Sequence, residues 1–197
     1  MKAAVVDLTA GKLASDRFRI DTPQPAKPDA MAGVLCELIE HHEWSGPLGV
    51  AFPAVVRQGI VGSAANIDES WIDVDADALF SAASGCDVHM LNDADAAGIA
   101  EMQFGVGALS DGSPFPGTVM MLTFGTGIGS ALFVDGVLVP NTELGHLELD
   151  GNDAELKASA KARERDDLSW KDWASRVEHY LSHVEALFSP DLFIVGG

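Results

Sequence analysis

Residues 118–139 read TVMMLTFGTGIGSALFVDGVLV. Apolar residues dominate Thr118–Phe124 and Ser130–Val134, which predicts two strands on either side of a Gly-rich turn. Asp135 and Gly136 form a strong hairpin signal, and a third strand follows at Val137–Val139. The stretch therefore predicts an antiparallel meander.

Strands and helices are also expected on both sides of this meander. They are a strand at Leu48–Phe52, a strand at Val88–Leu91, helices at Ala94–Phe104, Ala154–Arg165 and Ser169–Leu187, and a strand at Leu192–Val195. A further helix is expected from Asp29, with Asp29 as its N-cap. Gly, Ser and Pro are frequent in 105–117, so we expect one lobe in 1–108 and a second in 109–197.

Composition narrows the class of protein. With 197 residues and 47% hydrophobic content the chain can bury a core, but no apolar run approaches the about 20 residues that cross a bilayer. The N-terminus lacks a signal-peptide core, so a cytoplasmic location is expected. A net charge of −18 disfavours nucleic acids and anionic membranes as partners. Two distant cysteines, Cys36 and Cys86, indicate neither a disulfide framework nor a structural zinc site.

Three glycines alternate in the turn of the meander, at Gly125, Gly127 and Gly129. Such a turn lets backbone N–H groups approach an anion, and the hydroxyls of Thr123 and Thr126 are further donors. A tight β-turn explains the glycines equally well. A dinucleotide site is disfavoured because a strand, not a helix, is expected after them.

Two other groups of residues could carry chemistry. Asn92 and Asp93 lie where a strand meets a helix, and Asp93 is either a base for a hydroxyl or a helix N-cap. Glu143, His146 and Glu148 suit recognition of vicinal hydroxyls; a metal site or solvated charges are the rival interpretations.

Asn66 and Trp71 share a loop after a predicted hairpin at 55–61. Asn66 is a candidate ligand for a sugar hydroxyl. Trp71 either packs against the sugar or anchors the loop in the core, and the core is the better interpretation.

The order of these motifs carries more information than any one of them. Asn-Ile-x-x-x-Trp, Leu-Asn-Asp-Ala-Asp-Ala-Ala, Leu-Thr-Phe-Gly-Thr-Gly-Ile-Gly-Ser-Ala and Glu-Leu-Gly-His follow one another along the chain. This order resembles the ROK family of bacterial sugar kinases, and within it the members that use polyphosphate. The resemblance implies an α/β chain with the actin-like, ribonuclease H-like sugar-kinase fold: two lobes, a cleft between them, and an incomplete second lobe.

The resemblance also implies roles for particular residues. Asp93 is the implied catalytic base. The implied sugar ligands are Asn66, Asn92, Glu143, His146 and Glu155. The implied phosphate-binding residues are Thr123, Gly125, Thr126, Gly127, Gly129 and Lys2.

The implied reaction is phosphoryl transfer from polyphosphate or ATP to the 6-hydroxyl of glucose, with Mg²⁺ accompanying the donor and a homodimer as the assembly. Many family members hold zinc in a Cys-rich loop after the Gly-His pair, but here Asp150–Asp153 leads directly to Glu155, so no zinc is expected. Lys157, Lys161, Arg163 and Arg165 form a candidate track for polyphosphate; a solvated helix face explains them equally well.

Other readings of the function remain. The chain could be an ATP-dependent glucokinase or a kinase of another hexose. The family begins with Asp-x-Gly-Gly and continues beyond Gly196, so the chain is expected to be truncated at both ends. A sugar-binding fragment or sensor without turnover is therefore the alternative from a different class.

Overall fold

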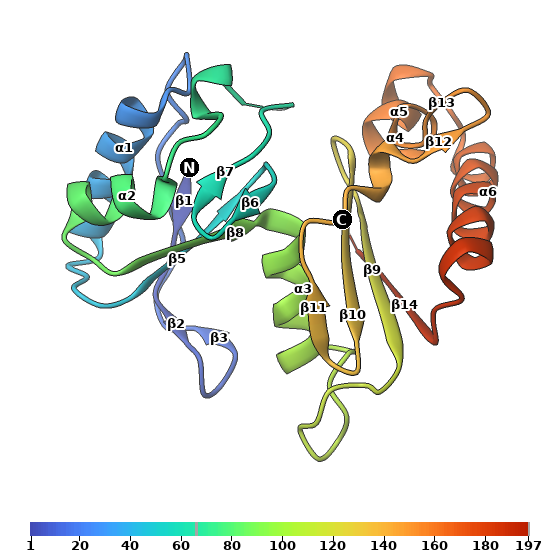
Figure 1. Ribbon diagram of the computed structural model, residues 1–197, viewed down its shortest axis with the longest axis horizontal. Helices are drawn as coiled ribbons and strands as arrows, with labels where there is room; N and C mark the ends of the chain where they lie inside the picture. Colours follow the sequence, from blue (N-terminus) through green and yellow to red (C-terminus); the bar gives the residue numbers. More distant parts are fainter. Residues whose placement is uncertain (66, 197) are drawn as a thin grey trace. The chain divides into compact units, whose positions relative to one another are not determined.

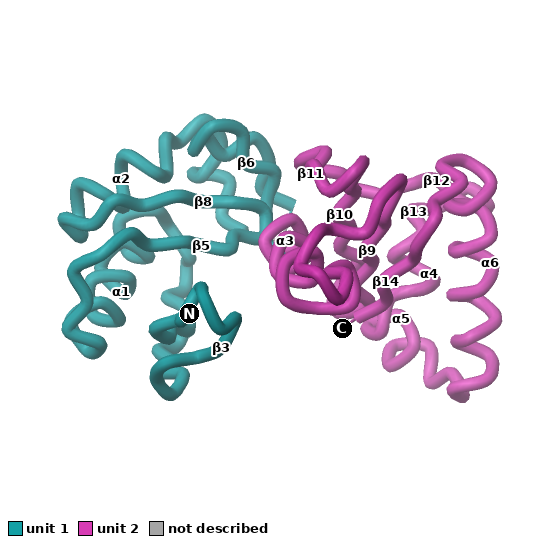
Figure 2. Tube along the Cα trace, turned by 90° about the horizontal axis from the view of Figure 1, so that it is seen from below, with its two compact units in different colours: residues 1–93 teal, residues 94–197 magenta. Residues whose placement is uncertain are grey.

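The computed structural model describes residues 1–65 and 67–196. The chain forms two compact units, Met1–Asp93 and Ala94–Gly197, drawn in teal and magenta in Figure 2. Within the described residues, no helix is both long enough and apolar enough to pass through a bilayer.

Unit 1 is built on two parallel strands, β5 (Leu48–Phe52) and β8 (Val88–Asn92), with Leu48 opposite Val88 and Phe52 opposite Asn92. Helices α1 (Pro28–His41) and α2 (Ala76–Ser84) pack against each other beside them (Figure 1). The described residues of this unit also form three short antiparallel strand pairs and one 3-10 helix. They are β1 (Lys2–Ala3) with β4 (Phe18–Arg19), β2 (Val6–Asp7) with β3 (Lys12–Leu13), β6 (Val56–Arg57) with β7 (Ile60–Val61), and η1 (Glu69–Trp71).

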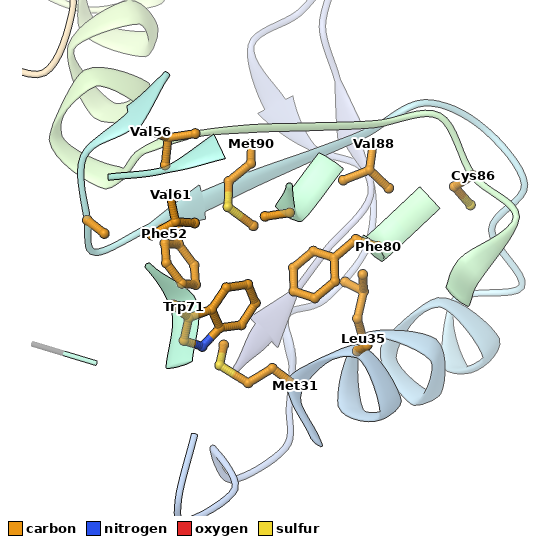
Figure 3. Close-up of a cluster of buried hydrophobic side chains, with 13 residues drawn as sticks. Met31, Leu35, Phe52, Val56, Val61, Trp71, Phe80, Cys86, Val88 and Met90 are labelled. Atoms are coloured by element: carbon orange, nitrogen blue, oxygen red, sulfur yellow. The ribbon is translucent and has the colours of Figure 1, made fainter. Parts of the chain in front are cut away.

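Aromatic side chains form the centre of the unit 1 core (Figure 3). Trp71 is fully buried, and its ring centroid lies 4.7 Å from that of Phe52 and 5.7 Å from that of Phe80. The indole N–H of Trp71 donates to the carbonyl oxygen of Ala26 over 2.8 Å. The interpretation of Trp71 as a core anchor is therefore confirmed.

Unit 2 contains one four-stranded sheet in the order β11-β10-β9-β14. Its strands are β9 (Thr118–Phe124), β10 (Ile128–Val134), β11 (Val137–Val139) and β14 (Leu192–Gly196). The first three form the expected antiparallel meander, and β14 adds to β9 in parallel. The expected hairpin at Asp135 and Gly136 is confirmed, with positive φ at both residues.

Helices cover both faces of this sheet. Met120 and Leu122 of β9 pack with Tyr180 and Val184 of α6 (Trp170–Phe188), while the intervening Met121 packs with residues of α3 (Asp93–Phe104). Successive strand residues point to opposite faces, so β9 is buried on both sides. The remaining elements are η2 (Leu144–His146), β12 (Glu148–Leu149), β13 (Asn152–Asp153), α4 (Glu155–Ala158) and α5 (Ala160–Arg165).

Three expectations differ from the structure. The units divide after Asp93 rather than after residue 108, because α3 packs on the sheet of unit 2. The N-cap of α1 is Lys27, and Asp29 lies inside the first turn because Pro28 already occupies a helical position. The helix expected at 154–165 breaks at Ser159, whose extended backbone lets its hydroxyl accept the N–H of Ala162 and cap α5.

Two helix glycines allow a test of the α3 packing. A Cβ at Gly98 would lie 2.6 Å from Cβ of Ala131, whereas a Cβ at Gly33 in α1 meets nothing within 4 Å. Overpacking typically costs about 1–3 kcal/mol, and Ala is favoured over Gly in a helix by about 0.5–1 kcal/mol. We expect Gly98→Ala to destabilise the chain by about 1 kcal/mol net and Gly33→Ala to stabilise it by about 0.5 kcal/mol. Urea denaturation of both variants measures the two signs; stabilisation by Gly98→Ala would contradict this packing.

Candidate active site

The Gly-rich turn joins β9 to β10 through Gly125, Thr126 and Gly127. The N–H of Gly125 donates to the carbonyl oxygen of Gly127 over 3.0 Å, and Thr123 pairs with Gly129 across the hairpin. A Cβ at Gly129 would lie 2.6 Å from Oγ1 of Thr123, so glycine makes room for that hydroxyl. The structure thus brings all five predicted phosphate-binding residues of this hairpin together.

Glu155 holds this turn in place. Its Oε2 accepts the N–H of Ile128 over 3.2 Å, and a Cβ at Gly127 would collide with the same carboxylate. On the other side, a Cβ at Gly145 would overlap the backbone oxygen of Ile128. Glycine at 127 and 145 therefore permits the turn, Glu155 and η2 to approach one another closely.

The segment carrying Glu143 and His146 is fixed to the sheet by Ser130. Ser130 is buried, and its Oγ donates to the carbonyl oxygen of Thr142 and accepts the N–H of Leu144 over 3.1 Å. From the other side, the hydroxyl of Tyr180 donates to the carbonyl oxygen of Leu144 over 3.2 Å. Burial raises the pKa of Tyr180 and keeps it a neutral donor.

His146 lies among carboxylates. Its Nδ1 is 3.0 Å from Oδ2 of Asp153. This hydrogen bond, followed by the charges of Glu155, Asp153 and Glu143, raises the pKa of His146, although partial burial opposes the change. Glu143, Asp153 and Glu155 therefore act together on the charge of the His146 ring. The binding of hydroxyls by Glu143, His146 and Glu155 stays a prediction.

Asn92 and Asp93 occupy the end of β8 and the first position of α3. Asn92 is buried, and its Nδ2 donates to the carbonyl oxygen of Ala54 over 3.1 Å, whereas Asp93 is exposed. A ligand beyond the carboxyl end of a parallel strand would meet these residues.

Two further residues complete the predicted set. Lys2 lies exposed on β1 of unit 1, and Asn66 lies outside the described residues. Within the residues that the structure describes, no three His, Cys, Asp or Glu side chains gather as metal ligands would.

Sequence reasoning did not single out several residues that shape the site. Besides Ser130 and Tyr180, these include Asp153 and Asp95, whose Oδ2 accepts the N–H of Asn141 over 2.8 Å. Asp95 is buried, and the only sequence signal is its position two residues after Asp93. The partners of these side chains lie far away along the chain, so no local pattern reveals them.

Similarity to solved structures identifies the fold class. The inorganic polyphosphate/ATP-glucomannokinase of Arthrobacter sp. strain KM superposes with a TM-score of 0.91 and 51% identity, covering 100% of this chain and 79% of that one. The ROK family glucokinase of Streptomyces griseus superposes with a TM-score of 0.74 at 22% identity, covering 100% and 79%, which shows the fold alone. The chain has the actin-like fold of sugar kinases, and the predicted fold class is confirmed.

Sequence comparison then gives the family. The ROK family profile matches residues 1–157. The polyphosphate glucokinase of Mycobacterium tuberculosis (strain CDC 1551 / Oshkosh) is 47% identical over 198 aligned positions, which cover 100% of this chain and 73% of that protein. The chain belongs to the ROK family, as the order of its motifs indicated.

Proposed function

We propose that this protein transfers the terminal phosphoryl group of polyphosphate to the 6-hydroxyl of glucose. The polyphosphate glucokinase of M. tuberculosis, at 47% identity, supports both the donor and the acceptor. The structural observation that carries the proposal is the carboxylate of Glu155, which binds the Gly-rich turn at Ile128 and belongs to the hydroxyl-binding cluster around His146. Glu155 therefore connects the proposed phosphate-binding turn to the proposed sugar-binding residues.

In the proposed reaction, the 6-oxygen of glucose forms a bond to the terminal phosphorus while the bond from that phosphorus to the bridging oxygen breaks. The leaving group is a polyphosphate one unit shorter. Asp93 accepts the proton of the 6-hydroxyl.

The other residues position the two substrates. Amide groups of the Gly125–Gly129 turn, with Thr123 and Thr126, hold phosphate oxygens. Lys2 adds a positive charge for the phosphates. The sugar hydroxyls are bound by Asn66, Asn92, Glu143, His146 and Glu155.

The proposed metal is Mg²⁺, bound to the donor as magnesium polyphosphate. Mg²⁺ usually keeps waters and binds substrate phosphates with few protein carboxylates, which fits a described chain without a three-residue cluster of metal ligands. When bound, the ion would neutralise charge on the phosphoryl group that is transferred.

A coupled assay that detects glucose 6-phosphate tests the proposal. Turnover is expected with glucose, Mg²⁺ and polyphosphate, and to stop when EDTA removes the metal. Calorimetry that detects glucose binding in a chain without turnover would favour a sugar-binding protein instead.

A second donor and a second acceptor are also candidates. The Arthrobacter protein, at 51% identity, is named a polyphosphate/ATP-glucomannokinase. We therefore propose ATP and mannose as alternative substrates, to be compared with polyphosphate and glucose in the same assay. We also propose that the protein is cytoplasmic and that it forms a homodimer. Sedimentation of the purified chain tests the second of these proposals.

The cations after Glu155 differ in what they contact. Arg165 and Arg176 share the carboxylate of Asp166 at 2.8 Å and 2.7 Å, and they hold its pKa well below the usual value. The guanidinium of Arg163 lies 3.8 Å from the ring centroid of Trp170. Lys157 and Lys161 are exposed and form no ion pair within the described part of the chain.

Lys161 is beside the turn, because its N–H donates to the carbonyl oxygen of Gly125 over 3.1 Å. We expect the double variant Lys157→Gln/Lys161→Gln to raise KM for long polyphosphate about three- to tenfold, since each exposed contact contributes up to about 1 kcal/mol. KM for ATP should change less. Lys171→Gln, at the start of α6, is the control that removes one positive charge outside the track. Equal changes in KM for polyphosphate and for ATP would argue against a polyphosphate-binding track at Lys157 and Lys161.

A further inference from the structure

The imidazole of His146 and the carboxylate of Asp153 form a hydrogen-bonded pair with Nδ1 and Oδ2 3.0 Å apart. The two residues come from different elements: His146 ends η2, and Asp153 ends β13. Their side chains are about half exposed, at 43% and 48%. An exposed pair of this kind adds little to stability, so its position within the hydroxyl-binding cluster requires another explanation.

A short hairpin delivers Asp153 to this position. β12 and β13 pair with Glu148 opposite Asp153, and the turn between them has positive φ at Asp150 and Gly151. The N–H of Ala154 donates to the carbonyl oxygen of Leu147 over 2.9 Å and closes the hairpin base. At the far end, Oδ2 of Asp150 lies 3.0 Å from Nε2 of His179 in α6. The hairpin is thus fixed at both ends.

The chemistry of the pair determines which nitrogen of His146 faces a ligand. An ionised carboxylate only accepts hydrogen bonds, so Nδ1 must carry the proton that it shares with Asp153. Nε2 is then the ring nitrogen left for a sugar hydroxyl. It accepts a hydrogen bond when the ring is neutral and donates one when the ring is charged.

The charged groups around His146 come from several elements. Asp153 lies on β13, Glu155 on α4 and Glu143 just before η2, and all three favour the charged ring. Glu148 on β12 faces Asp153 across the hairpin. Tyr180 of α6, which binds the carbonyl oxygen of Leu144, stays neutral.

We propose that Asp153 is a positioning residue of the sugar site: it fixes the ring and the tautomer of His146 so that Nε2 faces a hydroxyl of glucose. This inference rests on the proposed function, in which His146 binds the sugar. The alternative is that Asp153 only completes the β12–β13 hairpin. The two interpretations differ in the expected KM for glucose when the carboxylate of Asp153 alone is removed.

The test compares Asp153→Asn with Asp150→Asn in the full chain. Both variants remove one carboxylate from the same hairpin. Asn tolerates the positive φ of Asp150, and its amide oxygen can still accept a hydrogen bond from Nε2 of His179, so the far end of the hairpin stays fixed. Of these two aspartates, Asp153 hydrogen-bonds to His146, whereas Asp150 hydrogen-bonds to His179. We expect Asp153→Asn to raise KM for glucose about three- to tenfold, as the loss of about 1 kcal/mol of orientation implies. KM for polyphosphate and kcat should change less than twofold, and Asp150→Asn should match wild type.

The pH profile is a second readout. The pKa of His146 is raised in the folded chain, so stabilisation by the pair is present below the ordinary value of about 6.5 and is lost as pH rises through the raised value. Asp153→Asn removes the carboxylate whose hydrogen bond is the largest cause of the raised pKa of His146. The inflection in glucose kcat/KM assigned to His146 should therefore move to lower pH in this variant alone.

Nitrogen-15 NMR of His146, with the resonances assigned by comparison with His146→Gln, tests the positioning role of Asp153 independently of the proposed enzymatic function. We expect Nδ1 to carry the proton in the neutral wild-type ring, and glucose to shift the Nε2 resonance. A neutral ring protonated at Nε2, or Asp153→Asn with the glucose KM and pH profile of Asp150→Asn, would overturn the positioning role. If no variant has turnover, the proposed function fails, while the tautomer and the glucose-induced shift still test Asp153.

Discussion

Replacing Asp93 by Asn is expected to lower kcat for glucose phosphorylation by about 10²- to 10⁴-fold, the usual contribution of a positioned general base. Asn keeps the size of the side chain and loses the ability to accept the proton of the 6-hydroxyl. Asp93 is exposed at the first position of α3, directly after the strand end formed by Asn92. The glucose affinity should change little, because the loss concerns the transition state. Single-turnover phosphorylation and calorimetry with glucose measure the two quantities separately.

Asp29→Asn is the matched control for this experiment. Asp29 also lies in the first turn of a helix, α1, so both variants lose a favourable interaction with a helix N-terminus. The control should lose at most about 1 kcal/mol of stability and keep wild-type kcat. Wild-type turnover in Asp93→Asn would show that another group accepts the proton.

Trp71→Ala is expected to lower the free energy of unfolding by about 3–5 kcal/mol, the range for deletion of a buried aromatic side chain. Trp71 is 0% exposed and packs between Phe52 and Phe80 (Figure 3). The substitution leaves a cavity and removes the donor to the carbonyl oxygen of Ala26. Urea denaturation followed by circular dichroism measures the loss.

Trp170→Ala tests whether this loss is specific to burial. Trp170 is 67% exposed, and its ring is covered by the guanidinium of Arg163. Its removal should cost about 0.5–1 kcal/mol, as an exposed cation–π contact does. Equal losses in the two variants would mean that Trp71 does not anchor the core of unit 1.

Local sequence was sufficient to predict the type and the approximate bounds of most helices and strands. β5 begins and ends at Leu48 and Phe52 as expected, and α2 ends before Gly85, whose φ of 72° is left-handed. These boundaries depend on hydrophobic runs, glycine conformations and hairpin dipeptides, which act within a few residues. Ser159 shows the limit: its neighbours suit a helix, but its own hydroxyl caps a new one.

The candidate site also combines features that local sequence predicts with features that only the tertiary structure reveals. By itself, the sequence determined the strands, the glycine hairpin and the order of motifs that places the chain in the ROK family. It also determined the candidate residues around Asp93 and His146. The tertiary structure alone decided that α3 belongs to unit 2, that Glu155 accepts the N–H of Ile128 beside the Gly-rich turn, and that the side chains of Asp153 and His146 form a hydrogen bond. These features depend on close approaches between distant segments, at glycines 98, 127 and 145, and no local periodicity encodes which segments will meet.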